Sequence, residues 1–355
     1  MPVLGIGTWQ NEDPAQCTES VATALEMGYR HVDTAQAYGN EAAVGEGIAT
    51  ADVDREDVFL ATKVWIDQLA PEDVAASTRE SLQKLAVDSV DLLYVHWPAG
   101  AYDPEATLSA FADLRDDGLV DRIGVSNFEP EHLDAATDVL GEAPFANQVE
   151  MHPLLQQEEL REYADDSDVE LVAYSPLARG AVLENPTVTE IAEDHGVSAA
   201  QVSLAWLREK GVTAIPKATS EAHIRDNFAS LDVDLSEEDV AAIDAIEERD
   251  RRVDPDFGPL CMLGRGGVDI EETRDVTFRT IPVASEQAAS MLGEFDLPTA
   301  LDAAQREAVV DAVVSLSELY VDNPWIREGD VNPLLITAEG ATAVDGLFVG
   351  PDGDE

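Results

Sequence analysis

Short apolar runs alternate with amphipathic stretches along residues 1–253, and this alternation limits the fold more than any other feature of the sequence. Eight apolar runs have the length and composition of buried strands, at residues 3–8, 31–33, 58–64, 90–96, 122–126, 145–150, 170–174 and 212–215. Helical patterns lie between them, at residues 19–27, 71–85, 104–117, 129–139, 158–163 and 198–210. Strands that alternate with helices form a parallel sheet. Eight such units in about 250 residues predict an α/β domain of the (β/α)8 TIM-barrel type.

The glycine pattern after the first strand argues against the alternative, an open dinucleotide-binding sheet. Such a sheet has Gly-x-Gly-x-x-Gly directly after its first strand, and Gly5-Ile-Gly-Thr-Trp9 breaks that pattern. Polar residues instead follow the predicted strands at their carboxyl ends, where a TIM barrel has its active site. These residues are Asp33, Lys63, His96, Ser126, Asn127, Gln148, Glu150 and Tyr174.

The composition excludes several other classes of protein. The chain has 73 Asp and Glu against 21 Lys and Arg, and it has no basic cluster to neutralise nucleic-acid phosphates. No apolar stretch approaches the ~18 residues that span a bilayer, and the first residues lack the pattern of a signal peptide. Two cysteines are too few for a disulfide framework. We therefore expect a soluble, cytoplasmic protein with a small-molecule partner and with no nucleic-acid or membrane partner; its oligomeric state stays open.

The formal net charge of −52 is spread over all the predicted helices. An ordinary solvated surface is one interpretation, and adaptation to molar intracellular salt is the one we favour. At ~1 M salt the Debye length is about 3 Å, so repulsion among spread carboxylates is largely screened. Such a halophilic chain avoids lysine, and only Lys63, Lys84, Lys210 and Lys217 occur. Each of them is a candidate for a specific role.

Four residues have the chemistry of carbonyl reduction: Asp33, Lys63 and His96 at the predicted strand ends, and Tyr38 in a Tyr-Gly turn. A Tyr phenol is a weak acid, and a buried ammonium beside it favours the phenolate. Asp33 can keep Lys63 charged, and His96 can orient a carbonyl oxygen by a hydrogen bond. Reduction of a carbonyl needs such an acid together with a hydride donor such as a nicotinamide.

Several motifs, in their order along residues 3–255, resemble those of the aldo-keto reductase family. They are Leu4-Gly-Ile-Gly-Thr-Trp9, Gly28-Tyr-Arg-His-Val-Asp-Thr-Ala-Gln-Ala-Tyr-Gly-Asn-Glu41, Ala61-Thr-Lys63, Asp91-Leu-Leu-Tyr-Val-His-Trp-Pro98, Gly124-Val-Ser-Asn-Phe128, Asn147-Gln-Val-Glu150, Ala173-Tyr-Ser-Pro-Leu177 and Ile215-Pro-Lys217. The resemblance implies a barrel at residues 1–253. It also implies Tyr38 as general acid, Asp33 and Lys63 as the residues that tune it, and His96 as the residue that orients the substrate.

The same resemblance implies a binding site for NADPH, with NADH as the alternative cofactor. Residues implied for the nicotinamide and pyrophosphate are Ser126, Asn127, Gln148, Tyr174, Ser175 and Leu177. Those implied for the adenosine end are Lys217, Thr219, Ser220, His223, Arg225 and Asn227. His223 stands where many members of the family have an Arg for the 2′-phosphate, although Arg225 can reach the same group. Trp9, Trp65 and Trp97 are candidates for the wall of an apolar substrate pocket, with loop packing as the alternative.

The segment 254–355 has a different pattern and is predicted to be a small α+β unit. Its motifs Asp256-Phe-Gly-Pro-Leu-Cys-Met-Leu-Gly-Arg-Gly-Gly267 and Ile326-Arg-Glu-Gly-Asp-Val-Asn-Pro-Leu-Leu335 resemble the end of the ATP-grasp domain of ADP-forming acyl-CoA synthetases. The resemblance implies Glu328, Asp330 and Asn332 as ligands of a Mg²⁺-nucleotide. The upstream part of that domain does not occur in this sequence, so a truncated, inactive ATP-grasp-like fragment is expected. We predict a helix at 303–319, and strands at 275–279, 333–337 and 342–347.

The function that we expect is NAD(P)H-dependent reduction of an aldehyde or ketone to an alcohol, with no metal ion. One alternative is a barrel that binds a dinucleotide without turnover, because the segment after the barrel replaces the family's substrate-covering loop. The other is a role of the tail in ATP-grasp or acyl-CoA ligase chemistry.

The net charge generates a prediction about salt. At ~0.01 M salt the Debye length is about 30 Å, so the carboxylates repel one another over most of a domain, and net stability is only ~5–15 kcal/mol. We expect the near-UV ellipticity of the protein to be lost below ~0.5 M KCl and retained at ~2 M KCl. A melting temperature that does not change between ~0.05 and ~3 M KCl would contradict the halophilic interpretation.

Overall fold

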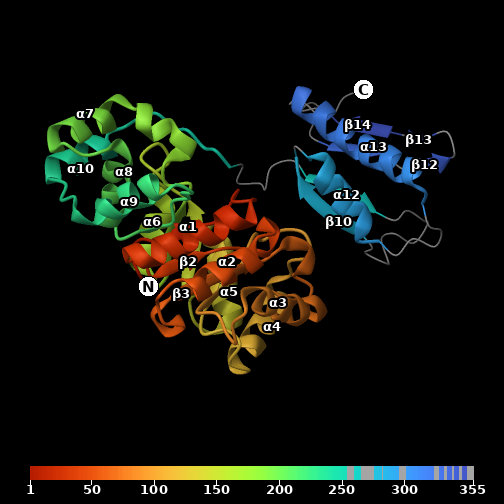
Figure 1. The fold of residues 1–355 in the computed structure, drawn as a ribbon, viewed down its shortest axis with the longest axis horizontal. Helices are drawn as coiled ribbons and strands as arrows, with labels where there is room; N and C mark the ends of the chain where they lie inside the picture. The colour runs from red at the N-terminus through yellow and green to blue at the C-terminus, as the bar shows by residue number, and fades with distance from the viewer. Residues whose placement is uncertain are drawn as a thin grey trace. The chain divides into compact units, whose positions relative to one another are not determined.

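The computed structural model describes residues 1–253, 260–264, 276–281, 283–295, 301–323, 328–331, 334–337, 340–343 and 346–349. By its internal contacts the chain divides into two compact units, Met1–Val253 and Asp254–Glu355 (Figure 1).

The first unit is a closed barrel whose parallel strands pair in sequence order from β1 to β8. The strands are β1 (Ile6–Gly7), β2 (His31–Asp33), β3 (Phe59–Val64), β4 (Leu92–Val95), β5 (Ile123–Ser126), β6 (Ala146–Glu150), β7 (Glu170–Tyr174) and β8 (Thr213–Ala214). The backbone N–H of Gly5 donates to the Ala214 carbonyl at 2.8 Å, and that of Gly7 donates to the Pro216 carbonyl at 3.1 Å. These bonds join the first strand to the last, so the predicted (β/α)8 fold is confirmed.

Helices follow the strands along the first unit. They are α1 (Pro14–Met27), α2 (Glu41–Thr50), α3 (Pro71–Leu85), α4 (Pro104–Asp116), α5 (Pro130–Leu140), α6 (Glu158–Asp166), α7 (Pro186–His195), α8 (Ala199–Glu209), α9 (Glu221–Phe228) and α10 (Glu237–Asp244). Helix α1 begins five residues before its predicted start at residue 19, because the Asp13 side chain accepts the Gln16 N–H at 2.8 Å and Pro14 fits the first helical position.

Two glycines let α2 pack closely against its neighbours. A Cβ atom added to Gly45 would lie 2.3 Å from the Leu85 carbonyl oxygen at the end of α3. One added to Gly47 would lie 2.9 Å from the Thr18 carbonyl oxygen of α1. Any side chain at these positions would therefore push the helices apart. Helix α2 directly follows the turn that carries Tyr38, so this packing also supports the candidate site.

In its described residues, the second unit has short antiparallel strand pairs and the helices α12 (Ser285–Gly293) and α13 (Ala303–Asp322). Strand β9 (Leu260–Gly264) pairs with β10 (Val276–Thr280), β11 (Glu328–Val331) with β14 (Gly346–Val349), and β12 (Leu334–Thr337) with β13 (Gly340–Ala343). Cys261, Val283, Ala288, Met291 and Val313 form a buried core. The expected small α+β unit is confirmed.

One predicted element of this unit is wrong. The sequence predicts a single strand at 342–347, but the structure has two strands there, β13 and β14, with different partners. The apolar pattern does not distinguish one strand from two here, because the two strands pair with different segments of the chain, β12 and β11. Of the three implied Mg²⁺-nucleotide ligands, Glu328 and Asp330 belong to β11, and Asn332 lies outside the described residues.

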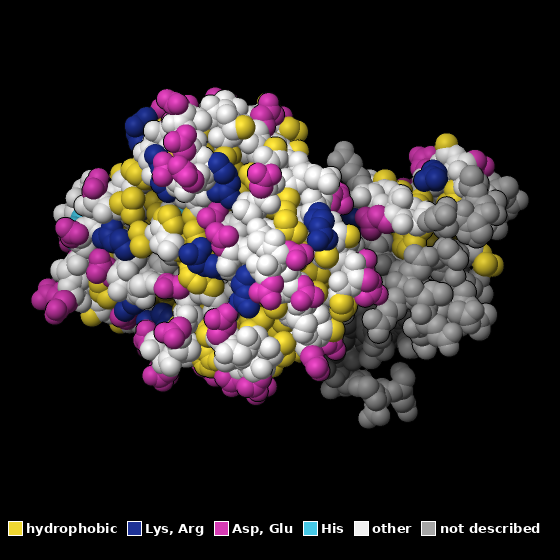
Figure 2. Space-filling view, turned by 90° about the horizontal axis from the view of Figure 1, so that it is seen from below, with side chains coloured by type: hydrophobic (Ala, Val, Ile, Leu, Met, Phe, Trp, Pro, Cys, Tyr) yellow, Lys and Arg dark blue, Asp and Glu magenta, His cyan; other side chains and the backbone are white. Residues whose placement is uncertain are grey.

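Acidic side chains are scattered over the face of the first unit that Figure 2 shows, with Lys and Arg side chains between them. They do not form one patch on that face, in agreement with their spread along the sequence. Within the described part of the chain, no helix is long and apolar enough to cross a membrane.

Candidate active site

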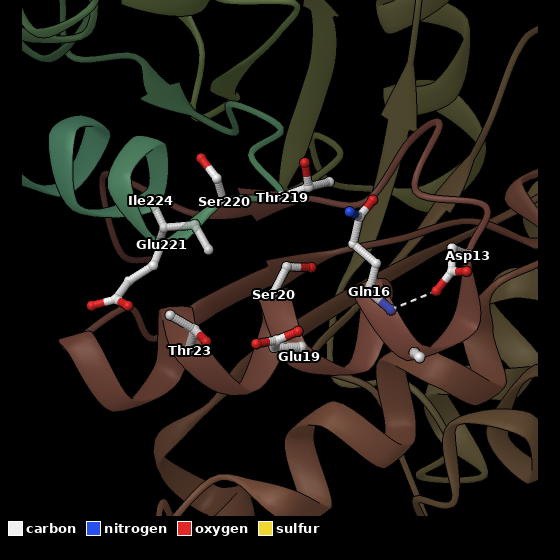
Figure 3. A pocket seen from close by; sticks show the side chains of 10 residues that line it. Asp13, Gln16, Glu19, Ser20, Thr23, Thr219, Ser220, Glu221 and Ile224 are labelled. Atoms are coloured by element: carbon white, nitrogen blue, oxygen red, sulfur yellow. Dashed lines mark hydrogen bonds between the residues drawn. The ribbon is translucent and has the colours of Figure 1, made fainter.

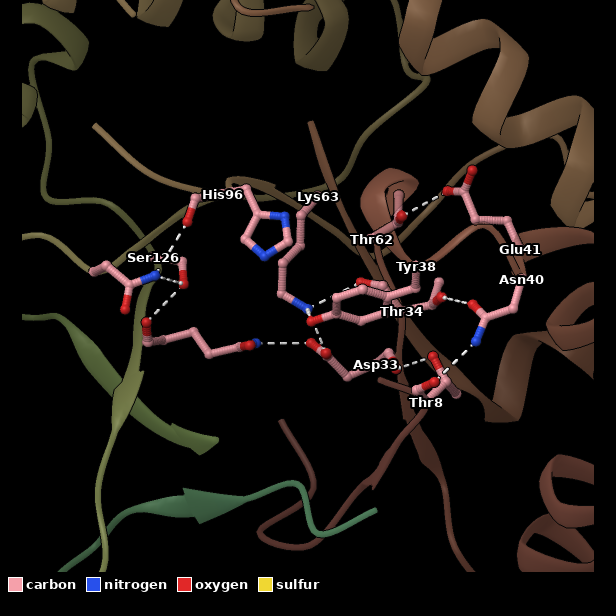
Figure 4. A network of polar contacts seen from close by, with 12 residues as sticks. Thr8, Asp33, Thr34, Tyr38, Asn40, Glu41, Thr62, Lys63, His96 and Ser126 are labelled. Atoms are coloured by element: carbon pink, nitrogen blue, oxygen red, sulfur yellow. Dashed lines mark hydrogen bonds and ion pairs between the residues drawn. The ribbon is translucent and has the colours of Figure 1, made fainter. Parts of the chain in front are cut away.

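The carboxyl ends of strands β2, β3 and β4 bring together the polar residues expected to carry the chemistry (Figure 4). Asp33 is the last residue of β2, Lys63 lies next to the end of β3, and His96 follows β4. Tyr38 comes from a short 3-10 turn, Gln36–Tyr38, which Gly39 ends with a left-handed backbone at φ 67°. All four predicted catalytic residues therefore lie at the mouth of the barrel.

A buried ion pair between Lys63 and Asp33 lies at the centre of this network. The two side chains are 1% and 2% exposed. Lys63 Nζ donates to Asp33 Oδ1 and also to the Thr34 carbonyl oxygen at 2.9 Å. The second carboxylate oxygen, Asp33 Oδ2, accepts from Gln148 Nε2 at 2.7 Å. Burial lowers the pKa of Lys63, but its interactions with Asp33 and Tyr38, hydrogen bonds included, together raise it by more, so the ammonium stays charged.

The Tyr38 phenol lies directly beside this ammonium. Lys63 Nζ donates to the Tyr38 hydroxyl at 3.2 Å and lies 5.0 Å from the centre of its ring. Burial raises the pKa of Tyr38, and Lys63 lowers it by less, so the net pKa is above the ordinary value of 10.0. The sequence suggested that the ammonium would favour the phenolate. The effect has the expected sign, but burial outweighs it, and the phenol is protonated at neutral pH.

His96 completes the group as a neutral imidazole. Burial and, second, the charge of Lys63 hold its pKa well below 6.5. Its ring meets those of Tyr38 and Trp65 edge to face, with centroid distances of 5.8 Å and 4.9 Å. Its Nδ1 atom is buried and has no hydrogen-bond partner among the described residues. A neutral ring of this kind can form a hydrogen bond with a carbonyl oxygen without adding charge to the site.

Residues from β5, β6 and β7 form a second hydrogen-bonded group. Ser126 Oγ donates to the Gln148 carbonyl oxygen at 2.7 Å, and Asn127 Nδ2 donates to Ser126 Oγ at 3.0 Å. The Tyr174 hydroxyl donates to Asn127 Oδ1 at 2.8 Å. Asn127 has a left-handed backbone, with φ 62°, and so does Ser175 in the turn after β7, with φ 46°. Leu177 follows in the same turn and is half-buried.

Lys217 lies apart from these groups, beyond the end of β8. It is exposed, and it is the one lysine without a carboxylate partner among the described residues. Ser220 caps α9 by accepting the His223 N–H at 3.3 Å, and the His223 side chain is exposed. The exposed Arg225 forms an ion pair with Glu221 at 2.7 Å, and Asn227 is buried.

A cleft of about 400 Å³ lies between α1 and the start of α9 (Figure 3). Thr219 and Ser220 line it, and so do the carboxylates of Asp13, Glu19 and Glu221. Three carboxylates repel a phosphate. Lys217 does not line this cleft, so it is a better candidate for contact with an anionic cofactor than the residues that do.

The three tryptophans have different surroundings. Trp65 contacts the His96 ring, next to Tyr38. Trp9 is 37% exposed, and the Arg179 guanidinium lies 4.8 Å from its ring centre. Trp97 is buried, which favours loop packing over a place in a pocket wall.

Comparison with known proteins gives the same interpretation as the geometry. The model of the Aldo/keto reductase family matches residues 3–248. The chain belongs to this family. An aldo-keto reductase of Mycobacterium sp. strain KMS is 44% identical over 256 residues, which are 71% of this chain and 91% of the relative. The glyoxal reductase of Bacillus subtilis is 42% identical, over 72% of this chain and 92% of its own.

Solved structures agree with this assignment. The aldose reductase of Schistosoma japonicum superposes on this aldo/keto reductase with a TM-score of 0.68 and 33% identity, over 71% of this chain and 90% of its own. The second unit matches a different model, that of the ATP-grasp domain, over residues 250–349. Both resemblances seen in the sequence are therefore confirmed, and the chain is an oxidoreductase of the aldo/keto reductase family with an ATP-grasp-like segment.

Several polar residues that support the reductase site had not been singled out as site residues. Gln36 Oε1 accepts the Trp65 N–H at 2.9 Å, which ties the turn of Tyr38 to the end of β3. Asn40 Nδ2 donates to the Thr8 carbonyl at 2.8 Å, and Thr62 Oγ1 donates to the buried Glu41 carboxylate at 2.7 Å. Gln36, Asn40 and Glu41 all fall inside a family motif. Their partners are residues from other strands and loops, which the motif alone does not indicate.

The ion pair generates a prediction about stability. Asp33→Asn leaves the Lys63 ammonium buried without a counter-charge, and removal of one partner of a buried pair costs ~3–5 kcal/mol. We expect a loss of this size in the free energy of unfolding, measured by urea denaturation at high KCl. The matched control is Glu80→Gln, which breaks the Lys84–Glu80 pair, whose side chains are 48% and 63% exposed. A loss no larger than that of the control would show that the pair does not hold the site together.

Proposed function

We propose that this aldo/keto reductase reduces an aldehyde or ketone to the alcohol, with NADPH as the cofactor and Tyr38 as the general acid. The observation that carries the proposal is the position of the Tyr38 hydroxyl, 3.2 Å from Nζ of the buried Lys63, which forms an ion pair with Asp33. A phenol in that position can give up its proton, because Lys63 stabilises the phenolate that remains.

Each of the four residues has its own role in the proposed reaction. His96 donates a hydrogen bond to the carbonyl oxygen of the substrate and holds it beside the Tyr38 hydroxyl. Tyr38 transfers its proton to that oxygen as negative charge develops on it. Lys63 then faces the phenolate, and Asp33 keeps Lys63 charged throughout. A bound nicotinamide supplies the hydride that reduces the carbonyl carbon.

The side chains present suit a nicotinamide dinucleotide. Ser126, Asn127 and Gln148 offer amide and hydroxyl groups that both donate and accept, as a carboxamide requires, and the Tyr174 ring offers an aromatic face. Ser175 and Leu177 would lie along the pyrophosphate. At the adenosine end, Lys217 would bind a phosphate, and Thr219, Ser220 and Asn227 would contact the uncharged adenosine. NADH stays the alternative cofactor, because the candidates for binding the 2′-phosphate of NADPH are weak. His223 is an exposed histidine where many family members have an Arg, and Arg225 already forms an ion pair with Glu221.

A small carbonyl compound is the substrate class that we favour. The similarity to a glyoxal reductase supports this choice. The complete set of Asp33, Tyr38, Lys63 and His96 favours turnover over dinucleotide binding alone, because binding does not require a proton donor.

The role of Tyr38 is tested by Tyr38→Phe. Loss of the proton donor should lower kcat for aldehyde reduction by ~10²–10⁴-fold and leave the dissociation constant of NADPH nearly unchanged. The control is Tyr163→Phe, since the Tyr163 hydroxyl binds Asp134 at the surface. Turnover of Tyr38→Phe within about threefold of the control would remove Tyr38 from the proton-transfer step.

The role of Lys217 is tested by Lys217→Met. Loss of one charge-assisted contact of ~1.5–3 kcal/mol should raise the NADPH dissociation constant at least about tenfold, as measured by fluorescence titration at high KCl. Lys210→Met is the matched control, because Lys210 pairs with Asp244 at 2.6 Å. Equal weakening for NADPH and NADH would place Lys217 at the pyrophosphate, and no weakening for either would remove it from the cofactor site.

A further inference from the structure

A buried carboxylate fixes the last residues of the first unit at the mouth of the barrel. Glu150, the last residue of β6, is 1% exposed. Its two carboxylate oxygens accept the backbone N–H groups of Arg252 and Val253, at 2.8 Å and 2.7 Å. Glu150 is also the register partner of Tyr174 on β7. The segment 250–253 is thus held beside the strand ends that carry the proposed nicotinamide site.

Two further contacts hold the same segment. The backbone N–H of Asp250 donates to the Leu154 carbonyl at 2.9 Å, and the Asp250 carboxylate forms an ion pair with Arg252. The residues on both sides of Arg251 are therefore anchored. An anchored backbone reduces the entropy lost when the side chain it carries binds a ligand.

Arg251 differs from its neighbours in its partners. Arg249 pairs with Glu158 at 2.9 Å, and Arg252 pairs with Asp250. Arg251 is exposed and has no carboxylate within ion-pair distance among the described residues.

Arg179 is a second such cation at the mouth. It lies in the turn after β7, stacks on Trp9, and likewise has no carboxylate partner among the described residues. Burial and the charge of Glu150 raise the pKa of the Tyr174 phenol, whereas Arg251 and Arg179 act in the opposite direction. The backbone agrees with this, because Arg179 lies in the turn that follows Tyr174, and Arg251 precedes the residues held by Glu150, the register partner of Tyr174.

We propose that Arg251, together with Arg179, binds the carboxylate of an anionic substrate, so that the reductase prefers aldehydes and ketones that carry a carboxylate group. This proposal rests on the proposed carbonyl reduction. A guanidinium binds a carboxylate through two parallel hydrogen bonds, and such direct contacts persist at molar salt, where attraction beyond ~3 Å is screened. A cofactor phosphate is the other anion to consider. Arg251 is held by β6, two strands away from the β8 end that leads to Lys217, but the turn after β7 that would carry the pyrophosphate is adjacent to β6. The titration of NADPH below distinguishes the two anions.

The experiment compares two substrates that differ only in charge, 4-carboxybenzaldehyde and methyl 4-formylbenzoate. The wild-type enzyme should have the higher kcat/KM for the acid, mainly through a lower KM. Arg251→Gln should lower the acid-to-ester ratio of kcat/KM about tenfold, the loss expected for one charge-assisted contact. The matched control is Arg249→Gln, which removes a nearby ion-paired arginine and should leave the ratio unchanged.

Calorimetric titration with 4-(hydroxymethyl)benzoate, at the same KCl concentration, measures the anion site without turnover. The NADPH-bound wild type should bind it at least about tenfold more tightly than Arg251→Gln does. An unchanged ratio and an unchanged affinity would overturn the proposal. It would also be overturned if Arg251→Gln weakened NADPH binding alone, since Arg251 would then belong to the cofactor. Absence of reduction with both aldehydes, while the benzoate still bound through Arg251, would refute the carbonyl reduction and not the anion site.

Discussion

The buried ion pair between Lys63 and Asp33 is the interaction on which the architecture of the candidate site depends. Two charges removed from water pay a desolvation penalty that their mutual attraction only partly repays, so they need further hydrogen bonds. Thr34 and Gln148 supply these bonds, from the end of β2 and from β6. The pair is therefore satisfied only when β2, β3 and β6 are in register within the closed barrel.

The same pair defines the chemistry available at the mouth. It places a fixed positive charge beside the Tyr38 phenol and near a neutral His96, while burial keeps the phenol protonated. Salt has little effect on an interaction between side chains that are 1% and 2% exposed, whereas exposed charges more than ~3 Å apart are screened at molar salt. For a chain with a net charge of −52, this separates the electrostatics of the site from those of the surface.

The sequence predicts the barrel well because each strand is a short apolar run between turn residues. Two strands, His31–Asp33 and Glu170–Tyr174, begin and end at the predicted residues. It also places the polar residues at the strand ends, since that depends only on strand order. The start of α1 depends on a single capping residue, Asp13, which an apolar pattern does not detect. The separation of β13 from β14 depends on their different pairing partners, which a local pattern does not reveal either.

The electrostatic details depend on contacts between residues far apart in the sequence. The sign of the Lys63 effect on Tyr38 follows from the residue types, but the larger effect of burial follows only from the packed structure. Glu150 and Arg252 are 102 residues apart, so no local pattern reveals that one anchors the other. That Arg251 has no carboxylate partner among the described residues likewise becomes visible only when their charges have been placed.

The central claim is that burial beside a charged lysine keeps Tyr38 as a neutral proton donor at working pH. It is tested most directly by ¹³C NMR of the protein labelled at tyrosine Cζ, titrated at high KCl. The chain has seven tyrosines, and the spectrum of Tyr38→Phe identifies the Tyr38 signal. The account predicts no phenolate shift of that signal until above about pH 10, because the pKa of Tyr38 is raised from 10.0. A midpoint below about pH 9 would show that the ammonium outweighs burial, and would contradict the account.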